Sequence, residues 1–304
     1  MSEHEPSLSV DQFWKDGFSH IRGLFSPDVI RSLRQTIVSK GIKSFRGDLL
    51  TYPELRDLVF DNRLLNLVRQ VLDSDKLVYC GDSNVTAGSR GFHKDNVDRD
   101  DPNGPDWTTG RYTVVRVGIY LQDHSVNSGG LNVIRGSHER VDTSGLENVY
   151  LRTRVGDAAI WSLRTTHSGS GYMHRFNPGL AIPPDWLDSR ESQIPKRKIV
   201  KRYLARGQRL IRKLQIRPAS EGRVACFMSF GVGDHHQQRF IDCLKSRQYA
   251  IDLWNASEHD DDVLRRAKEV GLEVLDMKKE NAANPAPEIY KVHTPIPYPK
   301  QNAA

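Results

Sequence analysis

Short runs of β-branched and aromatic residues, separated by clusters of turn-forming residues, fill the middle of this chain. Each run is too short for a typical helix and has the composition of a β-strand. Several such strands with turns between them predict a β-sandwich or a β-barrel. The runs are LVYC (77–80), YTVVRVGIYL (112–121), GLNVI (130–134), DAAIWSL (157–163) and RVACFMSF (223–230).

Helical patterns flank this β region. Residues 10–40 predict a helix, a short strand and a second helix that starts at Pro27, with the Ser26 hydroxyl as its N-cap. Apolar residues also recur near helical spacing over 53–74, and 235–254 reads as helical. We therefore expect one mainly β domain with flanking helices over 1–304, divided into an N-terminal helical layer (1–76), a core (77–168 and 222–232), a helical insertion (169–221), and C-terminal helices with an extended tail (233–304).

Basic residues are concentrated in one segment. The chain has a net charge of +6, but eleven Lys or Arg and one acidic residue lie between Arg190 and Arg217, so the remainder is acidic. Over 196–214 the apolar residues recur at helical spacing with basic residues between them, which predicts a basic amphipathic helix. Such a helix fits a lid that recruits an anionic substrate, or a peripheral contact with an anionic membrane surface. Sparse aromatic interleaving and the lack of a recognised motif disfavour nucleic acid as a partner.

The sequence also predicts where the protein resides. It contains no apolar run of about 18 residues, so we expect no transmembrane segment. Its first ten residues, MSEHEPSLSV, lack the basic start and apolar stretch of a secretory signal. We expect a cytoplasmic protein whose contact with a membrane surface, if any, is made by 196–214.

Two His-x-Asp tripeptides are candidate metal ligands, at His93–Asp95 and at His259–Asp261. Two residues that are two apart on a strand project to the same side. Two histidines and one carboxylate on one face form a common iron(II) site. The first tripeptide lies at the edge of the β region. The second lies in an acidic run that reads as a helix start, where positions i and i+2 do not share a face, so the sequence favours His93 and Asp95.

A third ligand and a partner for an organic co-substrate must come from elsewhere in the chain. His167 lies toward the end of the run GDAAIWSLRTTHSGSG (156–171), 72 residues after Asp95, with His124 and His138 as alternatives. A dicarboxylate that chelates iron needs a cation at its far end, and arginine binds carboxylates with two parallel hydrogen bonds. Arg223 opens a predicted strand and is the candidate, with Arg175 as its rival.

Five segments occur in an order that resembles the phytanoyl-CoA dioxygenase family of iron(II)- and 2-oxoglutarate-dependent oxygenases. They are QFWKDGFSHIRGLFSPDVIRSLR (12–34), FHKD (92–95), SGGLNVIRGSH (128–138), GDAAIWSLRTTHSGSG (156–171) and RVACFMSF (223–230). The resemblance implies a double-stranded β-helix, which is a jelly-roll or cupin-like core. It also implies iron(II) bound by His93, Asp95 and His167, 2-oxoglutarate held by Arg223 and hydrogen-bonded by Ser170, and O₂ as oxidant.

The same resemblance implies hydroxylation of a substrate as 2-oxoglutarate is converted to succinate and CO₂. An intact carboxylate at Asp95 argues against halogenation, because related halogenases lack that ligand. The family usually places the arginine about ten residues beyond the second histidine, whereas Arg223 follows His167 by 56 residues. With this basic insertion we expect an anionic small molecule, or a glycan or lipid-linked sugar acid, as substrate. The alternative is a non-catalytic jelly-roll metal- or ligand-binding protein that acts at an anionic membrane surface through 196–214.

Overall fold

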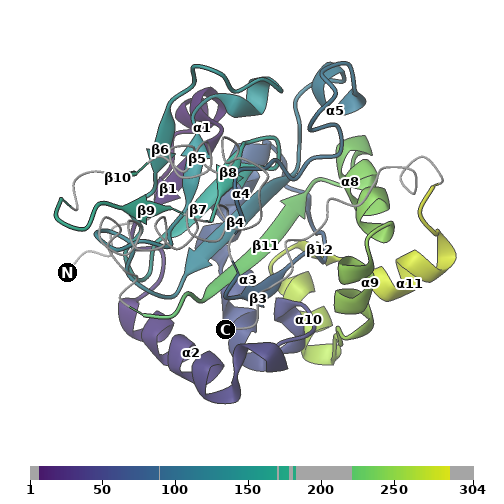
Figure 1. Ribbon diagram of the computed structural model, residues 1–304. Coiled ribbons are helices and arrows are strands. Elements are labelled where there is room, and N and C mark those ends of the chain that lie inside the picture. Colours follow the sequence, from purple (N-terminus) through teal and green to yellow (C-terminus); the bar gives the residue numbers. More distant parts are fainter. Residues whose placement is uncertain (1–6, 89, 170, 178–180, 183–220, 288–304) are drawn as a thin grey trace, which may run out of the picture.

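The computed structural model describes residues 7–88, 90–169, 171–177, 181–182 and 221–287. A mixed seven-stranded sheet, a smaller sheet and flanking helices make up this part of the chain (Figure 1). The large sheet has the order β1-β7-β4-β11-β2-β12, with β3 also paired to β11, and only β12 runs parallel to its neighbour. Its strands are β1 (Phe18–Ile21), β2 (Leu77–Tyr79), β3 (Asn84–Thr86), β4 (Val115–Tyr120), β7 (Ala158–Ser162), β11 (Ala225–Gly231) and β12 (Leu272–Val274).

The smaller sheet has three antiparallel strands, β6 (Asn148–Tyr150), β5 (Asn132–Ile134) and β8 (His167–Ser168), in that order. His93 extends it by an isolated bridge to His167, in which each amide donates to the carbonyl oxygen of the other residue at 3.0 and 2.9 Å. A separate pair is formed by β9 (Tyr172–Met173) and β10 (Ala181–Ile182).

All five predicted strand runs contain a strand, but the sequence missed six others among the described residues. These are β3, β6, β8, β9, β10 and β12, which have two or three residues each. The C-terminal region, predicted as helices and an extended tail, also contains β12, which pairs with β2. Within the predicted insertion (169–221), the described residues contain β9 and β10. The predicted helix over 196–214 lies outside the described residues.

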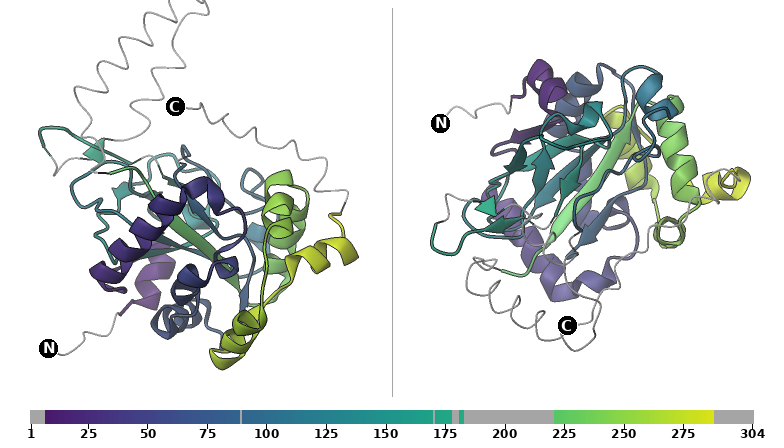
Figure 2. Two further views of the ribbon diagram at one scale, coloured as in Figure 1. Left: turned by 90° about the horizontal axis from the view of Figure 1, so that it is seen from below. Right: turned by 45° about the horizontal axis from the view of Figure 1, so that its top comes forward.

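One face of the large sheet is covered by the N-terminal helices (Figure 2). Successive residues of a strand point to opposite faces. Val117, Ile160 and Met228 are direct neighbours on β4, β7 and β11, and all three are fully buried against these helices. The helical layer comprises α1 (Val10–Asp16), α2 (Pro27–Lys40), α3 (Arg56–Val59) and α4 (Asn62–Leu72), with three single 3₁₀ turns between α2 and α3 (Ile42–Ser44, Leu49–Thr51 and Pro53–Leu55).

The opposite face of the large sheet packs against the smaller sheet. Tyr120 and Trp161 of the large sheet form one apolar cluster with Leu131 and Val133, which lie beside and on β5. Two sheets that face each other across a shared core form a sandwich, and this arrangement is consistent with a jelly roll. The next residue along a strand from each helix-covered position therefore faces the space between the sheets.

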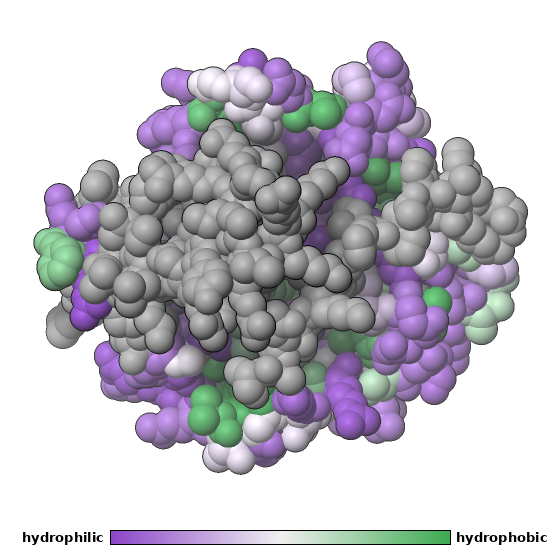
Figure 3. All heavy atoms as spheres, viewed as in Figure 1, coloured by the Kyte–Doolittle hydropathy of each residue, from purple (hydrophilic) through white to green (hydrophobic). Residues whose placement is uncertain are grey.

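The C-terminal helices close one end of this sandwich. Three of them pack around Cys80, Tyr112 and Leu163 through residues such as Phe240 and Trp254, whereas the helix that contains Val263 and Ala267 packs into the core shared with the N-terminal helices. Their outward faces are largely hydrophilic (Figure 3). Within the described residues, no helix combines the length and the apolar character that a membrane crossing requires. The helices are α8 (His235–Lys245), α9 (Gln248–Asn255), α10 (Asp261–Glu269) and α11 (Met277–Ala283); α5 (Pro105–Thr108) and a 3₁₀ turn (Ser137–Glu139) lie in the core loops.

Two helix starts test the sequence predictions. Helix α2 begins at Pro27 as predicted, but the Ser26 side chain makes no capping hydrogen bond, so the proline and not the hydroxyl sets the start. Asp260 is the N-cap of α10, and its side chain accepts a hydrogen bond from the Val263 amide at 3.1 Å. The tripeptide His259–Asp261 is therefore a helix start, as its acidic context indicated.

Candidate metal centre

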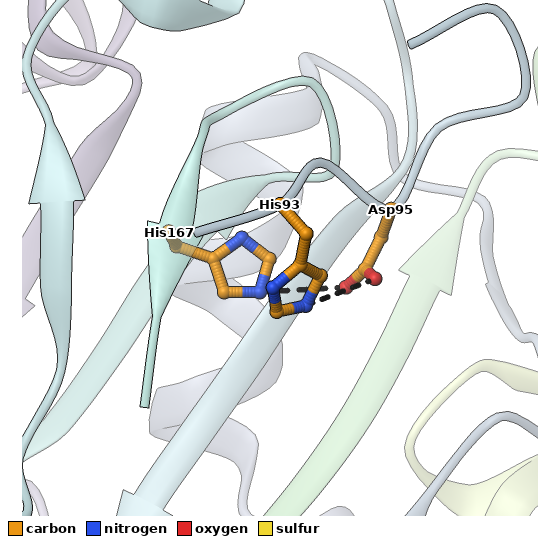
Figure 4. Close-up of side chains that lie close together, drawn as sticks. All are labelled: His93, Asp95 and His167. Carbon is orange, nitrogen blue, oxygen red and sulfur yellow. Dashed lines mark ion pairs between the residues drawn. The ribbon is translucent and has the colours of Figure 1, made fainter. Parts of the chain in front are cut away.

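His93, Asp95 and His167 lie close together between the two sheets and point toward one another (Figure 4). The Nε2 atom of His93 is 3.5 Å from Oδ1 of Asp95, and that of His167 is 3.5 Å from Oδ2. One potential ligand atom from each residue lies within 4.8 Å of the others. The bridge between His93 and His167 fixes both backbones, and the Asp95 amide donates to the carbonyl oxygen of Leu163 at 3.0 Å.

Lys94 connects the two segments that supply these residues. It stands between His93 and Asp95 in the sequence, and its buried ammonium donates to the carbonyl oxygens of Arg164, at 2.7 Å, and of Ser137. Buried ammonium groups are costly unless they are hydrogen-bonded. Lys94 therefore holds the His93 segment against the loop that leads to His167.

Backbone carbonyl groups orient both imidazole rings. The Nδ1 atom of His93 is 2.7 Å from the carbonyl oxygen of Gly91, and that of His167 is 3.0 Å from the carbonyl oxygen of Thr165. A carbonyl oxygen can only accept, so each Nδ1 carries the proton. Each Nε2 is then left with its lone pair toward Asp95, which is the tautomer that metal-binding histidines adopt.

The environment favours the charge states that metal ligands need. Burial lowers the pKa of His93 and lowers that of His167 to about 3, so both rings are neutral at pH 7. Burial alone would raise the pKa of Asp95, but the nearby Arg116 guanidinium holds that pKa well below its usual range. The buried Oδ2 atom of Asp95 has no hydrogen-bond partner among the described residues. Two neutral nitrogens, one carboxylate and an unsatisfied buried oxygen fit the ligand set of iron(II).

A cavity of about 200 Å³ opens beside this cluster. Its floor is the inner face of the large sheet, where Gly118 lies against the rings of Trp161 and Phe227. A Cβ atom at Gly118 would lie 2.9 Å from the Trp161 ring, so only glycine lets the rings pack here. Arg116 and Tyr120 line the cavity from the same face of β4. They are four residues apart, which separates them by roughly 13 Å along an extended strand.

Arg223 lines this cavity at the Tyr120 end, whereas Asp95 lies near Arg116 at the other. The Arg223 guanidinium carbon is 5.6 Å from the centre of the Tyr120 ring and 5.7 Å from that of Phe227. Its Nε donates to the carbonyl oxygen of Gly129 at 3.2 Å, and its Nη1 contacts that of Gly88. Arg223 thus projects into the space beside His93, Asp95 and His167.

The rival arginine and the alternative histidines lie elsewhere. Arg175 is exposed, with its guanidinium carbon 5.9 Å from the centre of the Phe176 ring, and it is not among the described residues that line the cavity. His138 is buried with its Nε2 atom 2.7 Å from the carbonyl oxygen of Trp14. Ser170 lies outside the described residues. The structure therefore brings Arg223 and not Arg175 to the cavity.

His124 supports the Arg223 end of the cavity. Its Nδ1 donates to the carbonyl oxygen of Ser128 at 3.1 Å, and its Nε2 lies 2.6 Å from the side-chain amide nitrogen of Gln122. The Gln122 side-chain oxygen accepts from the amide of Val224 at 2.8 Å. This chain of contacts leads to the residue next to Arg223, so His124 has a structural role here. It is not one of the three residues that could bind a metal.

His124 is expected to make the stability of the metal-free protein depend on pH. Burial lowers the pKa of His124 to about 4, from 6.5 in an exposed chain. Between these values only the unfolded state binds the proton, so the free energy of unfolding is fully retained above pH 6.5 and falls as the pH is lowered toward 4. Urea unfolding of wild type and of His124→Gln should show their difference shrinking by about 2 kcal/mol between pH 7 and pH 5. Parallel curves would contradict a lowered pKa.

The sequence analysis missed four residues that line the same cavity, Asp82, Arg90, Arg116 and Tyr249. Arg116 carried a signal, because a charged residue in the middle of an apolar strand must have a partner. Arg90 lies three residues before His93 in a glycine-bearing loop. Asp82 and Tyr249 follow no pattern in the sequence, and tertiary packing alone brings them to the cavity.

The chain is distantly similar to several solved structures. The 2-oxoglutarate-dependent non-heme epimerase SnoN of nogalamycin biosynthesis is 14% identical, with 73% of this chain and 80% of SnoN covered and a TM-score of 0.44. HygX from Streptomyces hygroscopicus is 18% identical (75% and 88% covered, TM-score 0.45), and AviO1 from Streptomyces viridochromogenes Tue57 is 16% identical (73% and 92%, TM-score 0.45). No curated protein matches the sequence.

The family assignment rests on the sequence. The family model described as phytanoyl-CoA dioxygenase (PhyH) matches residues 13–172, which is just over half of the chain and contains His93, Asp95 and His167. Enzymes of this family use iron(II), 2-oxoglutarate and O₂. The chain belongs to the phytanoyl-CoA dioxygenase (PhyH) family and is a non-heme iron(II)- and 2-oxoglutarate-dependent oxygenase.

Proposed function

We propose that this oxygenase hydroxylates an anionic small molecule, with His93, Asp95 and His167 as its iron(II) ligands and Arg223 as the partner of the distal carboxylate of 2-oxoglutarate. The observation that carries this proposal is that three ligand atoms converge in a cavity that Arg223 also lines. Such a triad leaves metal positions open for the co-substrate and O₂. Hydroxylation then converts substrate, 2-oxoglutarate and O₂ to hydroxylated substrate, succinate and CO₂.

Each protein residue has a defined task in this scheme. Bound iron(II) supplies the activation of O₂ that the reaction needs. Asp95 and the two neutral histidines hold the metal on one side. Arg223 fixes the far end of 2-oxoglutarate with a planar guanidinium suited to a carboxylate. Trp161 and Phe227 form an apolar floor that limits the access of water to the reacting centre.

The charge of the cavity supports an anionic substrate. Among the described residues that line it are three arginines and two aspartates, and the histidines are neutral, so the formal charge of this lining is +1. Iron(II) and the 2-oxoglutarate dianion add no net charge. Arg90 lies near the three candidate metal ligands, since its charge contributes to the lowered pKa of both His93 and Asp95. An anionic group on the substrate would balance this charge, and a sugar acid or a lipid-linked glycan acid would supply one.

We also propose that the two facing sheets form the double-stranded β-helix of this family, and that the basic insertion over 169–221 is a lid that recruits the same anionic substrate. Clusters of one charge sign raise the local concentration of an oppositely charged ligand. The β-helix proposal is supported by the packing of Tyr120 and Trp161 of the large sheet against Leu131 and Val133. The lid proposal is supported by the insertion's place in the sequence, between β8, which carries His167, and β11, which follows Arg223.

The proposal is tested by binding and by turnover. Anaerobic addition of iron(II) and 2-oxoglutarate to wild type should produce the weak visible charge-transfer band of the chelate. With O₂, succinate release should then be stimulated by carboxylic acids and not by their matched amides, and the product should carry one oxygen atom from ¹⁸O₂. Arg90→Gln should raise KM for the acid, while its KM for 2-oxoglutarate stays at the wild-type value. Equal stimulation by acids and amides would rule out the anionic substrate, and no band in iron-loaded wild type would rule out the site.

A further inference from the structure

Arg116 is a buried arginine with two carboxylate neighbours, one of which is the proposed metal ligand Asp95. It is the second residue of β4 and projects into the cavity, while Val115 and Val117 on either side face the helical layer. Its side chain is 15% exposed, and those of Asp82 and Asp95 are 7% and 12% exposed. Three charged side chains with so little exposure to solvent must be arranged so that their charges compensate one another.

The two carboxylates contact different nitrogens of the guanidinium. Nη2 of Arg116 hydrogen-bonds Oδ2 of Asp82. Nε of Arg116 lies 3.6 Å from Oδ2 of Asp95, just beyond hydrogen-bond distance. Nε of Arg116 and Oδ2 of Asp95 are buried, and neither has a hydrogen-bond partner among the described residues. A buried donor and a buried acceptor thus face each other, and a small rotation of either side chain would join them.

This geometry divides the oxygens of Asp95 between two tasks. Oδ1 lies on the His93 side of the cluster, whereas Oδ2 lies near both His167 and Arg116. A carboxylate can bind a metal through one oxygen or through both. An oxygen engaged by a guanidinium is less available to the metal, so the position of Arg116 favours binding through one oxygen.

We propose that Arg116, anchored by Asp82, is a positioning residue that restricts Asp95 to one oxygen as a metal ligand and so keeps three metal positions open. This inference rests on the proposed metal site. Two of these positions are needed by 2-oxoglutarate and one by O₂. A second oxygen from Asp95 would take one of them. Arg116 thus acts on the metal through Asp95.

Mn(II) in place of iron gives readouts that do not depend on turnover. Free Mn(II) is counted by its paramagnetic resonance signal, and the water molecules on bound Mn(II) are counted from the relaxation of water protons. In Arg116→Gln we expect Mn(II) to bind at least as tightly as in wild type, because a competing cation is gone. The number of bound waters should fall by about one third, since Asp95 takes one of three open positions. The dissociation constant of 2-oxoglutarate should rise roughly 10- to 100-fold, the range by which losing a group that orients a metal ligand typically lowers metal affinity or activity.

Two further variants separate this role from charge and from folding. Arg116→Gln combined with Asp82→Asn keeps the net charge of the cavity and leaves no unpaired buried carboxylate at Asp82. It should reproduce the loss of water and of 2-oxoglutarate affinity. Arg116→Lys keeps one donor near Asp95 and should restore both in part. Circular dichroism of each variant reports whether the fold is intact.

The outcomes distinguish the inference from the proposed function. If Arg116→Gln and the double variant keep the wild-type water number and 2-oxoglutarate affinity, Arg116 has a structural role only and the inference fails. If both lose Mn(II) affinity with the fold intact, Arg116 is needed to bind the metal, which also overturns it. If wild type binds no Mn(II), the proposed metal site itself is wrong.

Discussion

Replacing His167 with glutamine is expected to abolish the iron(II)-dependent charge-transfer band and 2-oxoglutarate turnover. Glutamine keeps a polar side chain of similar size, but its neutral amide is a poorer ligand for iron(II) than imidazole. We expect iron(II) affinity to fall by at least about a hundredfold, the upper end of what the loss of a ligand's hydrogen-bond partner costs. Anaerobic titration with iron(II) at saturating 2-oxoglutarate measures this effect.

The same substitution at His124 and His138 supplies matched controls. Both histidines are buried, and both are alternatives to His167 in the sequence, but neither belongs to the ligand cluster. His124→Gln and His138→Gln should therefore retain the band at stoichiometric iron. Loss of the band in either control, with an intact fold and with His167→Gln unaffected, would mean that the ligand set is wrong.

Replacing Arg223 with alanine is expected to weaken the binding of 2-oxoglutarate while leaving iron(II) binding close to wild type. Removing one partner of a buried charge pair costs about 2 to 5 kcal/mol, which corresponds to a roughly 30-fold or larger rise in the dissociation constant. The rise is measured by titrating 2-oxoglutarate into the iron(II)-loaded protein without O₂. The dissociation constant of 2-oxoglutarate for Arg223→Lys should lie between those of wild type and Arg223→Ala, because an ammonium keeps the charge but not the planar pair of donors.

Two controls assign this effect to the distal carboxylate. Arg175→Ala removes an exposed arginine and should leave the titration unchanged. The analogue 2-oxovalerate chelates a metal in the same way but has no distal carboxylate, so it should bind wild type and Arg223→Ala with equal affinity. An effect at Arg175 in place of Arg223 would mean that the basic insertion is misplaced in the proposed scheme.

Local patterns predicted the longer β runs well, because the β-branched and aromatic residues that favour a strand are neighbours in the sequence. The runs around β2, β4, β5, β7 and β11 each became a strand. Strands β3 and β8 were missed because their two or three residues lie in polar segments rich in glycine and serine, outside any β-branched or aromatic run. Strand β12 was missed for a different reason: Leu272–Val274 is short, lies between two helices, and is a strand only because β2 is there to pair with it.

Local context also settled which His-x-Asp pair to favour. His93 and Asp95 lie beside a strand, whereas Asp260 caps α10. Residue spacing by itself left His167, His124 and His138 open as the third ligand, and only the resemblance to the family favoured His167. That choice depends on the bridge between His93 and His167, which joins residues 74 positions apart and exists only because β8 pairs with β5.

The sequence by itself determined the strand runs, the helical flanks, the His-x-Asp pair and, through the order of its motifs, the family. Only the tertiary structure shows that Arg223 and not Arg175 lines the cavity. Ala225 pairs with Tyr120, and this pairing places Arg223 at the end of β4 where Tyr120 lies. The tertiary structure alone set Arg116 between Asp82 and Asp95. Periodicity is a property of neighbouring residues, whereas a site is built from residues that only strand pairing and sheet packing bring within a few ångströms.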